Sequence, residues 1–380
     1  MTFEFRTSIN VKCGNGIVDS LGTEVLKLGH NRVLFVTDPG LAKAGLSARG
    51  TDSLKAAGVE FEVYDTIEPN PRDNSLEAVW ERVKDQNIEA IVGFGGGSAM
   101  DGAKAIAVLA RNGGRLSAYD GPGKITNGAL PVVAIPTTAG TGSEVTSNAA
   151  ITDAARHQKM SLRSPSIIPS LALLDPDLLA TLPVKIAAES SMDAITHGFE
   201  SYISNRANTL SEGLSVQSLE YLCPNIRPFV ANRADSAVAK KMLIGSMFAG
   251  TVIGNTGTGN VHALARALGG IYDLPHGLAC SMMFPYVARF NFIACPGKYK
   301  VFARLLGLQP DGRSDSAICD MVVDELFRLC ADLGIPTRFS EIGLDDLNIE
   351  AVSEVAIGNS GPNPRTTTRA DLEYLLRQAA

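Results

Sequence analysis

The stretch V-G-F-G-G-G-S-A-M-D-G-A-K (92–104) decides the fold class of the first half of the chain. It overlaps E-A-I-V-G-F (89–94), an apolar run that predicts a buried strand, and it opens a helix that extends to about Ala110. The three glycines let the backbone approach a ligand closely. Ser98 can cap the helix, whose N-terminus offers free N–H groups and a positive dipole end. The loop predicts a pyrophosphate cradle, although a tight strand–helix turn without a ligand would use the same residues.

Strand and helix patterns alternate on both sides of this loop. The β-rich runs are 32–37, 60–64, 89–94 and 131–136, and helical patterns follow Gly40 to about Ala57 and cover 74–86. This alternation predicts an α/β domain with a parallel sheet and helices on both faces. A hairpin-like pair, A-A-I-T-D (149–153) with L-A-L-L-D (171–175), is expected to close the domain.

From Pro183 onward long helical patterns dominate, so the second half is predicted to be all-α. The expected helices are 184–203, 209–222, 236–253, 259–268, 277–293, 297–306, 315–333, 347–357 and 369–379. We therefore predict two domains, residues 1–182 and 183–380, with the cleft between them as the default site. Residues 242–265 lack Asp, Glu, Lys and Arg and are long enough to span a bilayer. Their Asn, His, Gly and Thr residues favour a helix buried inside a soluble domain.

The composition limits the class of function. The net charge is −6 at pH 7 and no run of Lys or Arg occurs, so we expect no nucleic-acid partner and no membrane surface. The six cysteines are scattered and form no C-x-x-C pair, which favours reduced thiols in a cytoplasmic protein. The start, M-T-F-E-F-R-T-S, has no signal-peptide pattern.

A second polar loop, P-T-T-A-G-T-G-S-E-V-T (136–146), also follows a strand and offers several hydroxyls. Two such loops at strand ends predict one extended ligand across the edge of the sheet. Asp38 ends the first strong strand, where an acid can bind a ribose 2′-OH and repel a 2′-phosphate, which would favour NAD over NADP. A turn-forming Asp before Pro39 explains the same residue equally well.

Four residues of the second half have the chemistry of a metal site. Asp193 and His197 are four residues apart and share one face of a predicted helix, and His262 and His276 lie in apolar surroundings. One carboxylate with three imidazoles suits a divalent first-row metal such as Fe²⁺ or Zn²⁺. A histidine alone on an apolar helix is more often a hydrogen-bonded core residue. The remaining histidines, at positions 30 and 157, are assigned no role.

Four motifs in this order resemble the iron-containing alcohol dehydrogenases, also called the group III metal-dependent alcohol dehydrogenases. The motifs are G-G-G-S-x-x-D-x-x-K (95–104), P-T-T-A-G-T-G-S-E-V-T (136–146), M-D-A-I-T-H (192–197) and H-A-L-A-R-A-L-G-G-I-Y-D-L-P-H-G (262–277). The resemblance covers essentially the whole chain and ends with N-P-R (363–365). It implies a dehydroquinate synthase-like fold, with an α/β nucleotide-binding domain before an all-helical one, and a homodimer or larger assembly.

The resemblance also implies an activity and residue roles. The activity would be an NAD(H)-dependent, metal-dependent oxidation of a small alcohol or reduction of an aldehyde. Metal ligands would be Asp193, His197, His262 and His276, binding Fe²⁺ or Zn²⁺. Cofactor contacts are expected at Asp38, Gly95, Gly96, Gly97, Ser98, Asp101, Lys104, Thr137, Thr138 and Ser143.

The chain departs from the family pattern at Arg266. Most members carry H-x-x-x-H where this chain has His262 and Arg266, and the second histidine is credited with proton relay. Arginine stays protonated and cannot relay a proton. It could pair with an anionic group of the substrate, or it could pair with a protein carboxylate and only shape the site. Ile253 stands where many relatives have Phe, and Ile253 and Asn148 are our candidates for substrate contacts.

Two other interpretations fit parts of the sequence. A maleylacetate reductase-like enzyme is one, although all four metal ligands are retained here. The other is a cofactor-binding protein without catalysis, which only Arg266 favours. Metal analysis and alcohol-dependent NAD reduction separate these alternatives.

Overall fold

A computed structural model describes residues 2–7, 9–156 and 158–380 of the chain, so His157 lies outside the described residues. The chain forms two compact units. The sheet unit comprises Thr7–Leu182 and Ala234–Leu243, and the helical unit comprises Pro183–Arg233 and Ile244–Ala380 with the N-terminal residues up to Arg6. Each unit is described by itself below.

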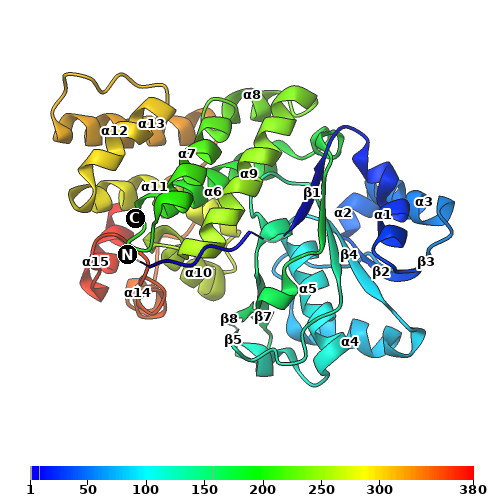
Figure 1. The fold of residues 1–380 in the computed structure, drawn as a ribbon. Helices are drawn as coiled ribbons and strands as arrows, with labels where there is room; N and C mark the ends of the chain where they lie inside the picture. The colour runs from blue at the N-terminus through cyan, green and yellow to red at the C-terminus, as the bar shows by residue number, and fades with distance from the viewer. Residues whose placement is uncertain (1, 8, 157) are drawn as a thin grey trace. The chain divides into compact units, whose positions relative to one another are not determined.

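The sheet unit contains a six-stranded parallel sheet (Figure 1). Its strands, in spatial order, are β1 (Asn10–Cys13), β9 (Leu171–Leu174), β6 (Val132–Pro136), β4 (Ala90–Gly95), β2 (Arg32–Val36) and β3 (Glu60–Tyr64). Every residue of β4 is buried, as expected for a parallel strand that helices cover on both faces. The predicted parallel α/β domain is confirmed.

Alternate residues of β2 pack on opposite faces of this sheet. Leu34 and Val36 belong to the core cluster that includes α4 (Asp73–Val83) and α5 (Gly97–Asn112). The ring of Phe35 lies against Gly50 in α3 (Leu46–Ala56), where a Cβ would be only 2.8 Å from it. The period of two residues places helices on both faces. The remaining helices of this unit are α1 (Leu21–Lys27) and α2 (Pro39–Lys43).

The predicted hairpin between 149–153 and 171–175 is wrong. β7 (Asn148–Asp153) pairs antiparallel with β8 (Gln158–Arg163), which also pairs with β5 (Gly121–Pro122) in a second, three-stranded sheet. β9 instead joins the parallel sheet between β1 and β6. The burial patterns of β7 and β9 give the physical reason. β7 alternates buried with half-buried residues, whereas all four residues of β9 are buried, as in a strand covered on both faces.

The second half is helical, as predicted. Its helices are α6 (Val184–Ile203), α7 (Thr209–Leu222), α8 (Ile226–Ala231), α9 (Ser236–Thr256), α10 (Asn260–Tyr272), α11 (His276–Asn291), α12 (Pro296–Leu305), α13 (Asp315–Asp332), α14 (Ile349–Ile357) and α15 (Arg369–Gln378). The six-residue α8 was not expected, because it is too short to show a helical period. The sequence also missed β1, a short edge strand whose residues are exposed or half-buried.

The central helix of the helical unit is α6. From Ser191 to Ile203 every residue is buried, which is typical of a helix surrounded by protein. Phe199 packs against Phe284 and Phe302, with ring centroids 5.2 and 4.5 Å away. This aromatic core fixes α6 against its neighbours, so polar side chains on α6 are held in defined places.

One helix of the described residues, α9 (Ser236–Thr256), is long and apolar enough to cross a membrane. Half of its most apolar window is buried inside the structure. Because core helices pass the same test of length and composition, this helix alone carries no membrane assignment.

Candidate metal centre and nucleotide-binding loops

Three buried polar side chains form one stripe along α6. Asp193, His197 and Glu200 occupy positions i, i+4 and i+7, which lie on the same face of an α-helix. Their exposed fractions are 1, 6 and 2 %. Buried ionisable groups are costly unless they are paired or bind a metal, so this stripe marks a site.

Two further helices bring the other ligand candidates to this stripe. His262 lies in α10 and His276 is the first residue of α11. The sequence predicts that this helix ends at residue 268, just before Gly269 and Gly270, but α10 continues through both glycines to Tyr272. The chain turns instead at Asp273, which has a left-handed backbone conformation with φ of 53°. Neither glycine adopts the positive φ with which glycine commonly ends a helix.

The three predicted histidine ligands face one oxygen of Asp193, although His197 stands outside the group of donors that all lie within 4.8 Å of one another. The Oδ1 atom of Asp193 lies 3.3 Å from Nε2 of His262, 3.7 Å from Nε2 of His276 and 3.9 Å from Nε2 of His197. Ligand atoms about 2.1 Å from a tetrahedral ion lie about 3.4 Å from one another. The spacing therefore fits a site for one divalent ion. The rings of His197 and His262 are also stacked, with centroids 4.5 Å apart.

Glu200 determines which nitrogen of His262 faces Asp193. Its carboxylate accepts hydrogen bonds from the backbone N–H groups of Gly259 (2.8 Å) and Val261 (2.7 Å), and it lies 2.7 Å from Nδ1 of His262. An ionised carboxylate only accepts, so Nδ1 carries the proton and Nε2 presents its lone pair. A Cβ at Gly259 would approach Oε1 of Glu200 to 2.9 Å, which explains the glycine there.

The result is a pair of buried acceptors that face each other. Within the described residues, neither Oδ1 of Asp193 nor Nε2 of His262 has a hydrogen-bond partner. Two lone pairs 3.3 Å apart repel each other unless a metal ion or a proton on Nε2 lies between them. The donor set and its geometry thus fit a metal ion, and a carboxylate that orients a histidine is the usual support of such a ligand.

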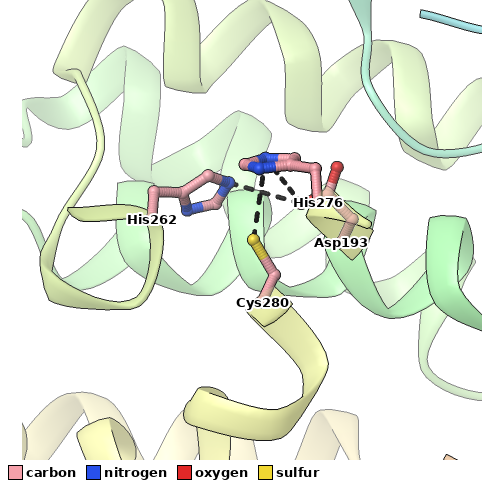
Figure 2. Close-up of side chains that lie close together, drawn as sticks. All are labelled: Asp193, His262, His276 and Cys280. Carbon is pink, nitrogen blue, oxygen red and sulfur yellow. Dashed lines mark hydrogen bonds and ion pairs between the residues drawn. The ribbon is translucent and has the colours of Figure 1, made fainter. Parts of the chain in front are cut away.

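Cys280 is a fifth candidate donor that the sequence did not suggest (Figure 2). One ligand atom each from Asp193, His262, His276 and Cys280 lies within 4.8 Å of all the others. Cys280 is one turn after His276 on α11, and its Sγ is 3.6 Å from Nε2 of that residue. Burial raises the pKa of the Cys280 thiol to about 12, so a metal would have to displace its proton. In the sequence, the only indication of Cys280 as a metal ligand is its H-x-x-x-C spacing from His276, and this spacing by itself is weak evidence.

Arg266 is half-buried on α10, one turn after His262. Its Nη2 donates a hydrogen bond of 3.0 Å to Oγ1 of Thr258. The pKa of His276 lies below its usual value, first because desolvation penalises the imidazolium, and the positive charge of Arg266 adds to this shift. Arg266 is therefore within electrostatic range of the candidate metal centre. Ile253 is buried in α9, and its contact with a substrate stays a prediction.

The N-P-R motif supports the helices of the centre. The side-chain oxygen of Asn363 accepts hydrogen bonds from the backbone N–H of Asn260 (3.3 Å) and the amide of Asn291 (3.0 Å). Asn363 thus ties the first residue of α10 to the last residue of α11. The amide of Asn260 donates to Oγ1 of Thr367 at 2.9 Å. Both the backbone and the side chain of Asn260 are therefore engaged in this network.

The glycine-rich loop lies at the carboxyl end of β4. Gly96 is the N-cap of α5 and no side chain caps the helix, so the prediction that Ser98 is the cap is wrong. The helix begins at Gly97 and Ser98 lies in its first turn, where N–H groups have no partner within the helix. A Cβ at Gly97 would be 2.7 Å from Thr141, so this loop and the second loop touch. The two predicted loops therefore lie side by side.

Asp38 lies at the same edge of the sheet. It follows β2, the neighbour of β4, at the point where the chain order reverses: β3 extends the sheet on one side and β6 on the other. Ligands of open α/β sheets bind at such a switch point. Oδ1 of Asp38 caps α2 by accepting a hydrogen bond from Leu41 N at 3.0 Å, which is the turn-forming role. A Cβ on Gly95 would be 3.4 Å from Oδ2, so the other oxygen faces the glycine loop.

Asp101 and Lys104 connect α5 to the second loop. Nζ of the fully buried Lys104 donates to Oγ of Ser143 (2.9 Å), the carbonyl of Asn148 (2.9 Å) and both oxygens of Thr146 (3.0 and 3.2 Å). Oδ1 of Asp101 accepts from Ser143 Oγ at 2.6 Å. The contacts seen for these two side chains hold the loop, and a direct contact with a cofactor stays a prediction. The side chain of Asn148 accepts a hydrogen bond from Ser161.

Fold and site together define the class: a parallel sheet with glycine-rich loops at a switch point, and a helical unit with a metal-type cluster. The chain belongs to the iron-containing alcohol dehydrogenase family. The family model described as iron-containing alcohol dehydrogenase matches residues 9–176, and the model of the C-terminal part of the Fe-containing family matches residues 187–380.

Characterised relatives extend over nearly the whole chain. The NAD-dependent methanol dehydrogenase of Bacillus methanolicus is 34% identical over 368 residues, which cover 96% of this chain and 97% of that protein. The sulfoacetaldehyde reductase of Bilophila wadsworthia (strain 3_1_6) is 33% identical over 383 residues, covering 99% and 98%. A crystal structure of 1,3-propanediol oxidoreductase superimposes with a TM-score of 0.96 at 33% identity and covers all of both chains.

Proposed function

We propose that this protein is an NAD(H)-dependent, metal-dependent alcohol dehydrogenase or aldehyde reductase that acts on a small alcohol or aldehyde. The observation that carries the proposal is the pair of unpartnered buried acceptors, Asp193 Oδ1 and His262 Nε2, which face each other 3.3 Å apart. Family membership supports the same activity. The names of the relatives above give methanol, 1,3-propanediol and sulfoacetaldehyde as substrates, and all three are small molecules.

The residue roles follow from the two units. Asp193, His197, His262 and His276 would hold the metal in residues 183–380. The loops at Gly95–Ser98 and Thr137–Ser143, with Asp38, would hold the cofactor in residues 1–182. When bound, the metal supplies a Lewis acid for the substrate oxygen and NAD exchanges the hydride. Glu200 keeps Nδ1 of His262 protonated and thereby keeps Nε2 available as a ligand.

The protein must also move a proton between the substrate oxygen and solvent. Arg266 cannot do this, because a guanidinium stays protonated at any working pH. A water chain or the cofactor ribose would carry the proton in its place. This separates the present protein from family members with a second histidine at this position.

We further propose that the preferred substrate bears an acidic group, such as a carboxylate, phosphonate or sulfonate. Arg266 lies within electrostatic range of the metal cluster, and its planar fork suits an oxyanion. The sulfoacetaldehyde reductase among the relatives, whose substrate carries a sulfonate, supports this substrate class.

One experiment tests the activity. Protein reconstituted anaerobically with Fe²⁺, and separately with Zn²⁺, is assayed with NADH against a panel of small neutral and anionic aldehydes, and with NAD against the matching alcohols. We expect metal-dependent turnover, fastest with an anionic aldehyde. Metal content near one ion per chain with no turnover of any member would count against the enzyme, and turnover by metal-free protein would count against the metal.

Asp38 gives a prediction about the cofactor. Asp38→Gly should raise the ratio of kcat/KM for NADP to that for NAD by about 10- to 100-fold, because NAD loses a charge-assisted hydrogen bond and the 2′-phosphate loses a repelling charge. Glycine is itself an acceptable N-cap, so the loss of the cap on α2 should cost only a few tenths of a kcal/mol.

Asp38→Asn is the matched control, because asparagine retains both the cap and a ribose acceptor but removes the charge. It should gain NADP use while keeping most of the NAD activity. A wild-type protein that already prefers NADP would show that Asp38 does not face the 2′ position.

We also propose that the protein is a cytoplasmic homodimer or larger homo-oligomer, as the family resemblance implies. Light scattering on the purified protein measures the oligomeric state, and a mass near the 40.1 kDa of one chain would contradict the proposed assembly.

A further inference from the structure

We propose that the sulfur of Cys280 is a direct donor to the metal in this chain, and that it shifts the preference of the site toward zinc. The inference rests on the metal centre proposed above and adds to it a donor that the four-residue set lacks. It concerns which ion the site holds, not which substrate it converts.

The position of the sulfur fits coordination. With a metal–sulfur distance of about 2.3 Å and a metal–nitrogen distance of about 2.1 Å, neighbouring donors of a five-donor site, at angles of about 90–120°, lie about 3.1–3.8 Å apart. The Sγ of Cys280 is 3.6 Å from Nε2 of His276, and both belong to the group whose ligand atoms all lie within 4.8 Å (Figure 2). Figure 2 shows the sulfur directed toward the imidazoles of His262 and His276 and not toward the helix axis.

The contacts of other thiols show that this arrangement is not simply how the chain packs a cysteine. The Sγ atoms of Cys295 and Cys330 donate to the backbone carbonyls of Asn291 and Ser281, which are ordinary structural contacts. The Sγ of Cys280 instead contacts an imidazole nitrogen. It does so next to two buried acceptors, Asp193 Oδ1 and His262 Nε2, that have no hydrogen-bond partner within the described residues. Those unpartnered atoms are the independent sign that a cation belongs beside the sulfur.

The chemistry gives the direction of the metal preference. Oxygen and imidazole donors serve Fe²⁺ and Zn²⁺ alike, whereas a thiolate is a soft donor that favours zinc. The rigid position of Cys280, fully buried one turn after His276 on α11, keeps the sulfur in place without a change of the backbone. A site with this fifth donor should therefore bind zinc more selectively than a site of one carboxylate and three imidazoles.

Cobalt substitution tests the proposal without measuring activity. Metal-free full-length protein is loaded with Co²⁺, and its absorption is recorded for wild type, Cys280→Ser, Cys280→Ala and the control Cys223→Ser, which removes another buried thiol. We expect a sulfur-to-cobalt charge-transfer band in the near ultraviolet for wild type and the control. Both Cys280 variants should lose this band while they keep the visible cobalt bands of the remaining ligands.

Metal competition measures the preference itself. The affinity for Zn²⁺ relative to Fe²⁺ is determined anaerobically with a chromophoric chelator. Because even groups that only support a ligand alter metal affinity 10- to 100-fold, loss of a direct sulfur donor should lower the affinity for Zn²⁺ at least about tenfold. The affinity for Fe²⁺ should fall less, so the ratio falls, because a thiolate favours zinc. The control should leave the ratio unchanged.

The outcomes separate the two proposals. Wild-type protein that binds cobalt without a sulfur band overturns the role of Cys280 and leaves the proposed enzyme intact. Wild-type protein that binds no metal overturns the metal centre and this inference together. The wild-type spectrum shows whether any sulfur binds the metal, and loss of the band in either Cys280 variant identifies Cys280 as that sulfur even if the other variant fails to fold.

Discussion

Replacing His262 by alanine should lower metal content and activity together. His262 supplies a nitrogen whose lone pair faces Asp193 Oδ1 at 3.3 Å, so its loss removes a ligand and not merely its support. Loss of a supporting group costs 10- to 100-fold in metal affinity, and we expect at least about 100-fold for the ligand itself. The measurements are metal per chain after dialysis, and kcat/KM at saturating metal.

Stability must be measured alongside, because the substitution also affects Glu200. The carboxylate keeps its two backbone donors but loses the contact with Nδ1, which is 2.7 Å away and buried. A buried acceptor that loses a hydrogen-bond donor lowers the free energy of unfolding by about 1–3 kcal/mol. A thermal melt of the metal-free proteins separates this cost from the lost metal affinity.

Glu200→Gln provides the graded comparison. The glutamine amide offers one oxygen and one NH₂ group where the site holds three donors, so at least one donor must face another donor. We expect an affinity loss of about 10- to 100-fold, smaller than for His262→Ala. A His262→Ala protein with full metal content and full activity would show that the metal lies elsewhere.

Much of the fold could be predicted because strong local patterns coincide with the elements. Pro183 precedes a long apolar segment, and α6 has the predicted bounds, 184–203. β4 was recognisable from its apolar run before the glycines. The partner of β7 was not, because pairing depends on tertiary neighbours: an apolar run such as that of β9 does not say which strands flank it.

Part of the candidate metal centre could be predicted from the sequence for the same reason. Asp193 and His197 share a helix face at i and i+4, so the spacing alone brings them together. Cys280 meets His262 only because α10 and α11 pack against each other, and no sequence period encodes that contact. Glu200 extends the same stripe at i+7, a position that a search for metal ligands alone does not weigh. Asp38 shows that a local structural role can accompany a predicted binding role. We predicted it as a cofactor contact, and in the structure its side chain also caps α2.

Replacing Arg266 by alanine should impair turnover of an anionic substrate much more than turnover of a neutral one. Arg266 is half-buried within electrostatic range of the candidate metal centre, and a charge-assisted hydrogen bond to an acidic group is worth about 1.5–3 kcal/mol. The value of kcat/KM for the best anionic aldehyde should therefore fall by roughly 10- to 150-fold, whereas propanal should change little.

Two further variants locate this effect. Arg289→Ala removes an arginine from the neighbouring α11, where it forms an exposed ion pair with Asp320, and it should leave both substrates unaffected. Arg266→His restores the residue most family members carry, so it should gain activity on simple alcohols while it loses the anionic substrate. If Arg266→Ala instead reduces kcat/KM for neutral and anionic aldehydes equally, then Arg266 acts through its hydrogen bond to Thr258 and only shapes the site. An acidic substrate would then have no support from the charge of this side chain, because the same loss for both classes cannot come from an ion pair that only one of them forms.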